Sequence, residues 1–164
     1  MTWGIPTGIF LDIHVALSLI ALVFGVIVLY GMLSGEVLGG WTALFLAALI
    51  LTSVTGFPLA PFGLDPPRMV GIVSLILLAI AVLAIYAFGL RGAWRWIYVV
   101  AAMMAFYLDA FVGVIQAFAK LPFLHALAPT QSEPPFLIAQ VAVLVIFVVL
   151  GFLAVRRFHP EHGA

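Results

Sequence analysis

Four residues toward one end of a long apolar segment have the types and spacing of a ligand site inside a membrane. Asp109, Gly113, Gln116 and Lys120 follow one another at intervals of four, three and four residues. At 3.6 residues per turn, this spacing places all four on one face of a helix. A carboxylate near mid-membrane costs on the order of 2.5 to 3.5 kcal/mol, and such acids usually serve a function. We therefore predict that Asp109 binds a cation, a proton or a polar ligand group. The alternative is a structural hydrogen bond or ion pair between helices.

The first apolar segment repeats the pattern with His14, Ser18, Ala21 and Gly25, again spaced by four, three and four residues. Small residues allow close approach and polar groups avoid lipid, so each stripe indicates the face that a helix turns to its neighbours. We expect the first and fourth spanning helices to touch through these faces. Asp12 points to nearly the opposite side of the helix from His14, so the two are not a chelating pair.

The other polar residues of the apolar segments are expected at a similar depth, toward one side of the membrane. Arg68 is expected to pair with Asp109, because a planar guanidinium group bridges helices at little entropic loss. Lys120 is placed at the mouth of the site, where it can stay hydrated. The sequence assigns no catalytic residue. The predicted ligand-binding residues are Asp109, Gln116, Arg68, His14, Gln140 and Lys120.

The histidines leave open whether the chain holds a cofactor. His14 is the one histidine within a spanning segment, and His125, in a connection on the same side, is the one candidate for a second axial ligand. The chain has no cysteine, which excludes thiol catalysis, Cys-ligated zinc, iron-sulfur clusters and disulfides. We expect no cofactor and no metal site, and a haem held by His14 and His125 is the alternative.

The elements that must position these residues are membrane-spanning helices. Of the 164 residues, 66% are hydrophobic and 7% charged, against roughly 25% charged in a soluble domain. A spanning helix needs about 20 mostly apolar residues, and five segments qualify: 9–33, 41–57, 67–88, 94–119 and 135–155. The sequence therefore predicts an all-α polytopic transmembrane bundle of about five helices, with residues 1–164 forming a single transmembrane domain.

The charges predict orientation and partners. Six basic residues balance six acidic ones, which excludes nucleic-acid binding. With five spans, four cations fall on one side and two on the other: Arg91, Arg95, Arg156 and Arg157 against Arg68 and Lys120. The positive-inside rule then places the N-terminus outside and the C-terminus in the cytoplasm. The expected partners are the lipid bilayer and either further copies of the chain or a larger membrane complex.

Three segments carry a family resemblance: TSVTGF at 52–57, GAWRWIY at 92–98 and APTQSEPPF at 128–136. They resemble a group of small, uncharacterised bacterial integral membrane proteins of similar length. The resemblance implies a bacterial source, hence the inner membrane, and the same helical architecture. It implies no activity and transfers no catalytic residue.

Three functions remain open from the sequence. The favoured one is a non-enzymatic membrane protein that binds a small ligand or ion in a polar pocket, or serves as an accessory subunit. The second is a membrane oxidoreductase that holds haem or a metal. The third is an oligomeric transporter or proton channel, with its path between subunits, because the other half of each segment carries almost no polar residue for a permeation path.

Overall fold

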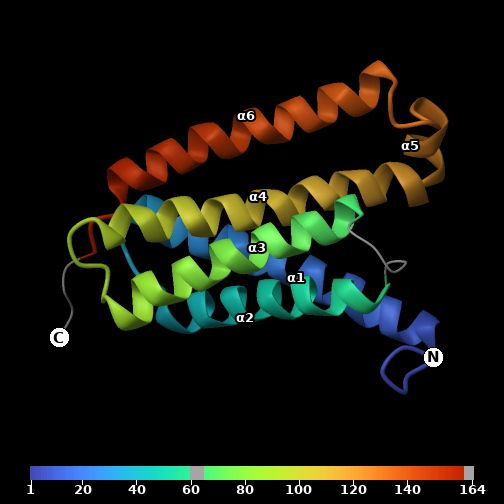
Figure 1. The fold of residues 1–164 in the computed structure, drawn as a ribbon. Helices are drawn as coiled ribbons and strands as arrows, with labels where there is room; N and C mark the ends of the chain where they lie inside the picture. Colours follow the sequence, from blue (N-terminus) through green and yellow to red (C-terminus); the bar gives the residue numbers. More distant parts are fainter. Residues whose placement is uncertain (60–64, 161–164) are drawn as a thin grey trace.

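The computed structural model describes residues 1–59 and 65–160, and these form an all-α bundle (Figure 1). Five helices are long and apolar enough to cross a membrane when two short continuations are counted with them. They are α1 (Thr7–Ser34), α2 (Gly39–Gly56) with η1 (Phe57–Leu59), α3 (Pro66–Val82) with the π-helical turn η2 (Leu83–Ala87), α4 (Trp94–Lys120) and α6 (Pro134–Arg157). The predicted fold class is confirmed.

Local sequence explains where the helices begin and end. The Asp65 side chain caps α3 by accepting a hydrogen bond of 3.2 Å from the backbone N–H of Arg68, and Pro66 opens the helix, where a missing N–H costs nothing. Glu133 and Pro134 start α6 with the same residue types. Helix α1 ends at Gly35, whose φ of 81° is the left-handed conformation that glycine adopts without strain.

The connection between α4 and α6 contains an additional short helix, α5 (Pro122–Leu127). After α5, the Glu133 carboxylate accepts hydrogen bonds from the Thr130 hydroxyl at 2.8 Å and from the backbone N–H groups of Thr130 and Ser132. Desolvation raises the pKa of Glu133, but the hydrogen bonds from Thr130 and the backbone outweigh it, so the pKa lies below its usual value. This turn fixes the start of α6.

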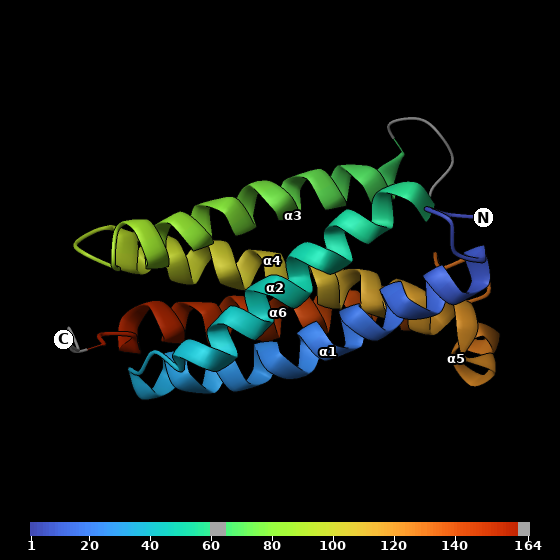
Figure 2. The ribbon, with the colours of Figure 1, turned by 90° about the horizontal axis from the view of Figure 1, so that it is seen from below.

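The helices follow one another around the bundle, with α1 beside α2, α2 beside α3, α3 beside α4 and α4 beside α6, while α1 also contacts α4 and α6 (Figures 1 and 2). The core is aromatic at its centre. The Phe106 ring lies 5.6 Å from the Phe45 ring and 4.9 Å from the Phe147 ring, measured between centroids. At Gly25 helix α1 approaches α4 so closely that an added Cβ would lie 2.5 Å from the Phe106 ring.

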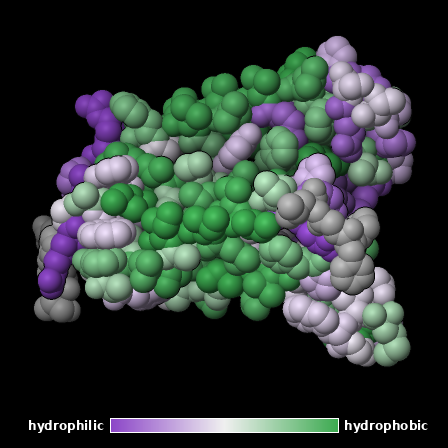
Figure 3. Space-filling view, in the orientation of Figure 1, coloured by the Kyte–Doolittle hydropathy of each residue, from purple (hydrophilic) through white to green (hydrophobic). Residues whose placement is uncertain are grey.

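The two ends of the bundle differ. The N-terminus, η1, the start of α3 and α5 share one end, called here the N-terminal end, and the end of α6 lies at the other, the C-terminal end (Figure 1). On the visible face, a hydrophobic surface covers the middle of the bundle and hydrophilic residues gather at both ends (Figure 3). At the C-terminal end, Arg95 on α4 donates hydrogen bonds to the carbonyls of Val155, at 3.3 Å, and Phe158, at 2.6 Å.

Candidate functional site

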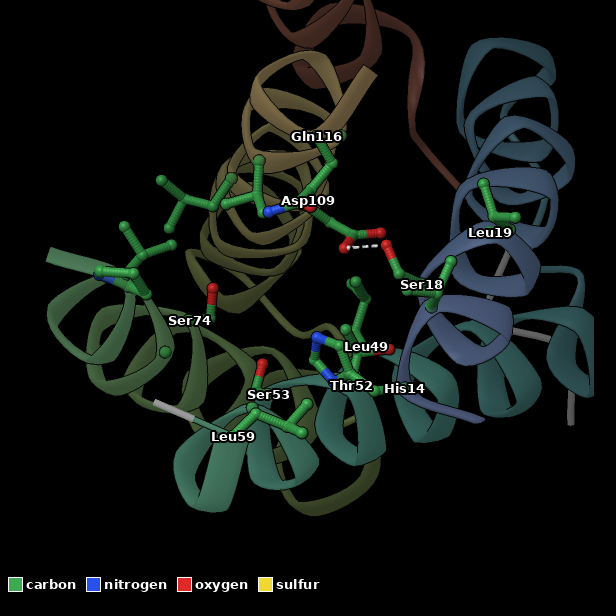
Figure 4. Close-up of a pocket in the computed structure, with 18 of the residues that line it drawn as sticks. His14, Ser18, Leu19, Leu49, Thr52, Ser53, Leu59, Ser74, Asp109 and Gln116 are labelled. Atoms are coloured by element: carbon green, nitrogen blue, oxygen red, sulfur yellow. Dashed lines mark hydrogen bonds between the residues drawn. The ribbon is translucent and has the colours of Figure 1, made fainter. Parts of the chain in front are cut away.

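A cavity of about 580 Å³ lies between α1, α2, α3 and α4 in the half of the bundle nearest the N-terminal end. Its walls are mostly apolar, as is usual for small-molecule sites. Figure 4 shows polar side chains reaching toward this space from all four helices. Those in its deeper part are His14, Ser18, Thr52, Ser53, Ser74 and Asp109.

Asp109 is the most constrained group of the cavity. It is 9% exposed, and its Oδ1 accepts a hydrogen bond of 2.8 Å from the Ser18 hydroxyl of α1 (Figure 4). Its Oδ2 is buried and has no hydrogen-bond donor among the described residues. A buried acceptor without a donor costs about 1–3 kcal/mol, and more when it is charged. The carboxylate is therefore oriented through one oxygen, while the other is buried without a donor among the described residues.

Asp109 also tests the predicted contact between the first and fourth helices. The Ser18–Asp109 hydrogen bond joins α1 to α4 directly. A Cβ added at Gly113 would lie 3.8 Å from Leu22 of α1, and one added at Gly25 would meet Phe106 of α4. The predicted contact of the two helices is confirmed. Among the described residues, the polar contact between α1 and α4 is limited to Ser18 and Asp109, because His14 is hydrogen bonded to α2 instead.

His14 is held by α2 through its Nδ1, which lies 2.9 Å from the Thr55 hydroxyl. That hydroxyl has a single hydrogen, which it donates to the backbone carbonyl of Leu51 at 2.7 Å or of Thr52 at 3.2 Å. With its hydrogen on one of these carbonyls, the Thr55 hydroxyl accepts from Nδ1–H. In the neutral ring this leaves Nε2 as an acceptor, and His14 lines the cavity.

Thr52 contributes a second buried atom that the fold leaves without a partner. The residue is 9% exposed, and its Oγ1 has no hydrogen-bond partner among the described residues. It reaches the cavity from α2, whereas Asp109 reaches it from α4. Thr52, Ser53 and Ser74 were not among the predicted site residues. The signal that could have identified them is the presence of hydroxyl groups at one depth on two otherwise apolar helices.

Three longer polar side chains line the cavity nearer the ends of their helices: Arg68 on α3, and Gln116 and Lys120 on α4. Lys120 lies eleven residues beyond Asp109, or about 16 Å along the helix axis. The prediction that Arg68 pairs with Asp109 is wrong, because the donor to the carboxylate is Ser18. The Arg68 guanidinium donates instead to the carbonyl of Phe57 at 3.1 Å, since its position at the first turn of α3 places it beside the end of α2.

The structure brings five of the six predicted ligand-binding residues to one cavity, and the sixth lies elsewhere. Gln140 on α6 is not among the lining residues. Its amide donates to the carbonyl of Phe111 at 3.2 Å, which ties α6 to α4. Its depth follows from the sequence, but α6 packs on a different side of α4 from the cavity. Gln140 is therefore a helix-to-helix contact.

The second histidine considered as a haem ligand also lies apart from the cavity. His125 is exposed on α5, and it is not among the residues that line the cavity with His14. Within residues 1–59 and 65–160, no group of three or more His, Asp or Glu side chains could together hold a metal ion. Of the residues proposed for haem, His14 alone faces the cavity.

None of the family models, curated proteins or solved structures compared with the chain matches it.

Proposed function

We propose that the chain is a non-enzymatic membrane protein that binds a small ligand or ion in the cavity between α1, α2, α3 and α4, either by itself or as an accessory subunit. The observation that carries this proposal is the buried Oδ2 of Asp109, which has no donor among the described residues and belongs to a side chain lining the cavity. A fold that needed Asp109 only as a helix contact would gain by satisfying both oxygens.

Two features favour binding over catalysis. The groups best suited to move a proton, Asp109 and His14, are hydrogen bonded to different hydroxyls, those of Ser18 and Thr55. A serine nucleophile needs a base within hydrogen-bond reach that takes its proton and is itself oriented by a third group. Here the Ser18 hydroxyl donates to a carboxylate, and the imidazole is turned toward another helix. The polar groups of the cavity are arranged as separate contacts for a ligand.

We further propose that the protein lies in a bacterial inner membrane with its cavity facing outward. The helix ends assign Arg91, Arg95, Arg156 and Arg157 to the C-terminal end, against Arg68 and Lys120 at the N-terminal end. The excess of cations favours a cytoplasmic C-terminal end. The cavity, near the N-terminal end, then opens to the outer side.

The transporter alternative has less support in the packing. Beyond the cavity, toward the C-terminal end, the space between the helices is filled by buried apolar side chains, among them Val28, Met32, Phe45 and Phe106. A permeation path needs polar groups or water along its length unless a hydrophobic gate interrupts it. Transport by one copy would require these packed side chains to separate.

The oxidoreductase alternative is tested by the absorption spectrum of the protein purified from cells supplied with a haem precursor. We expect no Soret band, because His125, the one candidate for a second axial ligand, lies apart from the cavity that His14 lines. A Soret band that disappears in a His14→Ala variant would contradict the proposal and make haem binding the leading function.

Access to the cavity is tested by thiol labelling, which the lack of native cysteine makes unambiguous. Ser53→Cys and Leu51→Cys form a matched pair on α2, since Ser53 lines the cavity and Leu51 is 49% exposed on the surface expected to face lipid. Thiols react as thiolates, which need water. We expect a charged, membrane-impermeant reagent added to intact cells to label Ser53→Cys and to leave Leu51→Cys unmodified.

Two other labelling patterns would contradict the proposal. Labelling of Ser53→Cys only in inverted membranes would reverse the orientation. Equal protection of both variants from either side would mean that the cavity does not admit water-soluble molecules, and Asp109 would then be a dry contact between helices.

A further inference from the structure

One wall of the cavity is open toward the side of the bundle as well as toward its end. Leu19 on α1 is 58% exposed and Leu11 is 39% exposed, yet both line the cavity. Gln116 on α4 is likewise exposed and lines it. A side chain can be exposed on the surface and also line the cavity only where the cavity wall has an opening. In Figure 4, Leu19 and Gln116 project from α1 and α4, the two helices bridged by the Ser18–Asp109 hydrogen bond.

Contacts between α1 and α4 limit how far this opening extends along the bundle. Helices α1 and α4 pack closely at Gly25 and Phe106, where there is no space for a further side chain. They are bridged once more at Ser18 and Asp109. Toward the N-terminal end of this bridge the seam is lined by exposed residues. On a helix that spans a membrane, exposed apolar residues such as Leu19 face lipid, so the seam leads from the bilayer to Asp109.

The groups that a molecule would meet beyond this seam include three that can accept a hydrogen bond, one of them a carboxylate. Asp109 offers Oδ2 and Thr52 offers Oγ1, both buried without a partner among the described residues. His14 offers Nε2 when the ring is neutral, because Nδ1 donates to Thr55. These three acceptors come from α4, α2 and α1. A primary ammonium group has three N–H donors and a compensating charge for the carboxylate.

We propose that the cavity is entered sideways from the bilayer between α1 and α4, and that it takes an amphiphilic amine whose ammonium group pairs with Asp109. This inference rests on the proposed binding function of the same cavity. The apolar chain of the ligand lies along the seam beside Leu19. The bound pair is the same whether a neutral amine meets the protonated carboxyl group or an ammonium cation meets the carboxylate. The pair is neutral overall, so no net charge remains buried in the hydrocarbon.

An anionic amphiphile does not fit this arrangement, because its charged group would face the Asp109 carboxylate. Lys120 and Arg68 offer positive charge only near the helix ends, and Lys120 is about 16 Å from Asp109 along the axis. A neutral alcohol fits the hydrogen-bonding groups but brings no charge to the carboxylate. Three amphiphiles with the same apolar chain but an amine, an alcohol or a carboxylate headgroup therefore distinguish these ligand classes.

The test measures equilibrium binding of radiolabelled dodecylamine, dodecanol and dodecanoate to the protein in lipid nanodiscs, with empty nanodiscs as the blank. We expect saturable binding of dodecylamine alone, weakened by about tenfold or more in Asp109→Asn, which removes a charge-assisted hydrogen bond. The matched control is Asp12→Asn. Asp12 is an exposed carboxylate on the same half of α1 and does not line the cavity, so its removal changes only the general attraction of the bilayer for cations.

The route is tested with a second matched pair, Leu19→Trp and Val23→Trp. Both positions are exposed on α1, at 58% and 60%, one turn apart, but only Leu19 lines the cavity. We expect the larger ring to slow association of dodecylamine by about tenfold or more at position 19, where it obstructs the seam, and to have no effect at position 23. Equal rates in both variants would overturn sideways access.

The remaining outcomes separate this inference from the proposed function. Saturable binding of dodecanol with equal affinity by the native protein and Asp109→Asn, or preferential binding of dodecanoate, would overturn the amine and leave the cavity as a binding site. Saturable binding of none of the three would overturn the inference, while labelling of Ser53→Cys from outside would still support a site for a water-soluble ligand. Circular dichroism and the elution volume of each variant establish that it is folded.

Discussion

Replacing Gly25 by leucine is expected to destabilise the bundle by about 1–3 kcal/mol, the usual cost of overpacking a close contact. A Cβ alone at this position would lie 2.5, 2.6 and 2.8 Å from three atoms of the Phe106 ring. The ring cannot withdraw freely, because it packs edge-on against Phe45 and Phe147. Leucine has a higher helix propensity than glycine by up to about 1 kcal/mol, which offsets only part of the loss.

The matched control is Gly8→Leu in the same helix, where an added Cβ meets nothing within 4 Å. Unfolding of each variant in mild detergent, followed by circular dichroism, gives the comparison. Truncating the ring in the double variant Gly25→Leu, Phe106→Ala is expected to restore space, so the two substitutions are less than additive. Equal midpoints for Gly25→Leu and Gly8→Leu would mean that α1 and α4 are not in close contact at this position.

The second large effect is expected at the C-terminal end of the bundle. Arg95→Met is expected to lower the free energy of unfolding by about 1.5–3 kcal/mol, the range for hydrogen bonds of charged groups. Arg95 of α4 donates to the carbonyls of Val155 and Phe158 at 3.3 and 2.6 Å. These carbonyls belong to the end of α6, which has no further helical turn to satisfy them. Methionine keeps an apolar stem but leaves both carbonyls without this donor.

Arg157→Met is the control for Arg95→Met, because it removes the same charge from the same end of the bundle at an exposed side chain. We expect this control to change the free energy of unfolding by less than about 0.5 kcal/mol. Thermal unfolding in detergent, repeated in bicelles, measures both. A loss shared equally by the two variants would show that total positive charge at this end matters rather than the contact between α4 and α6.

Taken together, the two contacts describe how the bundle is held around its cavity. In the middle of the bundle α1 packs tightly on α4 at Gly25, and at the C-terminal end Arg95 of α4 is hydrogen bonded to the end of α6. In the N-terminal half, α1 and α4 are joined by the hydrogen bond from Ser18 to Asp109 and by Leu22, which lies beside Gly113.

The helices and their inward faces were predictable from the sequence. Apolar runs of spanning length, ended by glycine and started by proline after an acidic residue, indicate each helix by interactions that reach only a few residues along the chain. The stripes around Asp109 and His14 follow from the helical period alone. The spacing of Asp109, Gln116 and Lys120 along the helix axis, about 16 Å from first to last, follows from the rise per residue.

The tertiary structure decided which of these groups meet. Asp109 accepts from Ser18 rather than Arg68, His14 turns to Thr55 of α2, and Gln140 binds the backbone of α4 away from the cavity. The depth of a residue in the membrane is a local property of its helix, but its direction around the helix axis has meaning only relative to the neighbours. Those neighbours are selected by close packing, such as that of Gly25 on Phe106, because lipid provides no hydrophobic driving force that would distinguish one apolar helix from another.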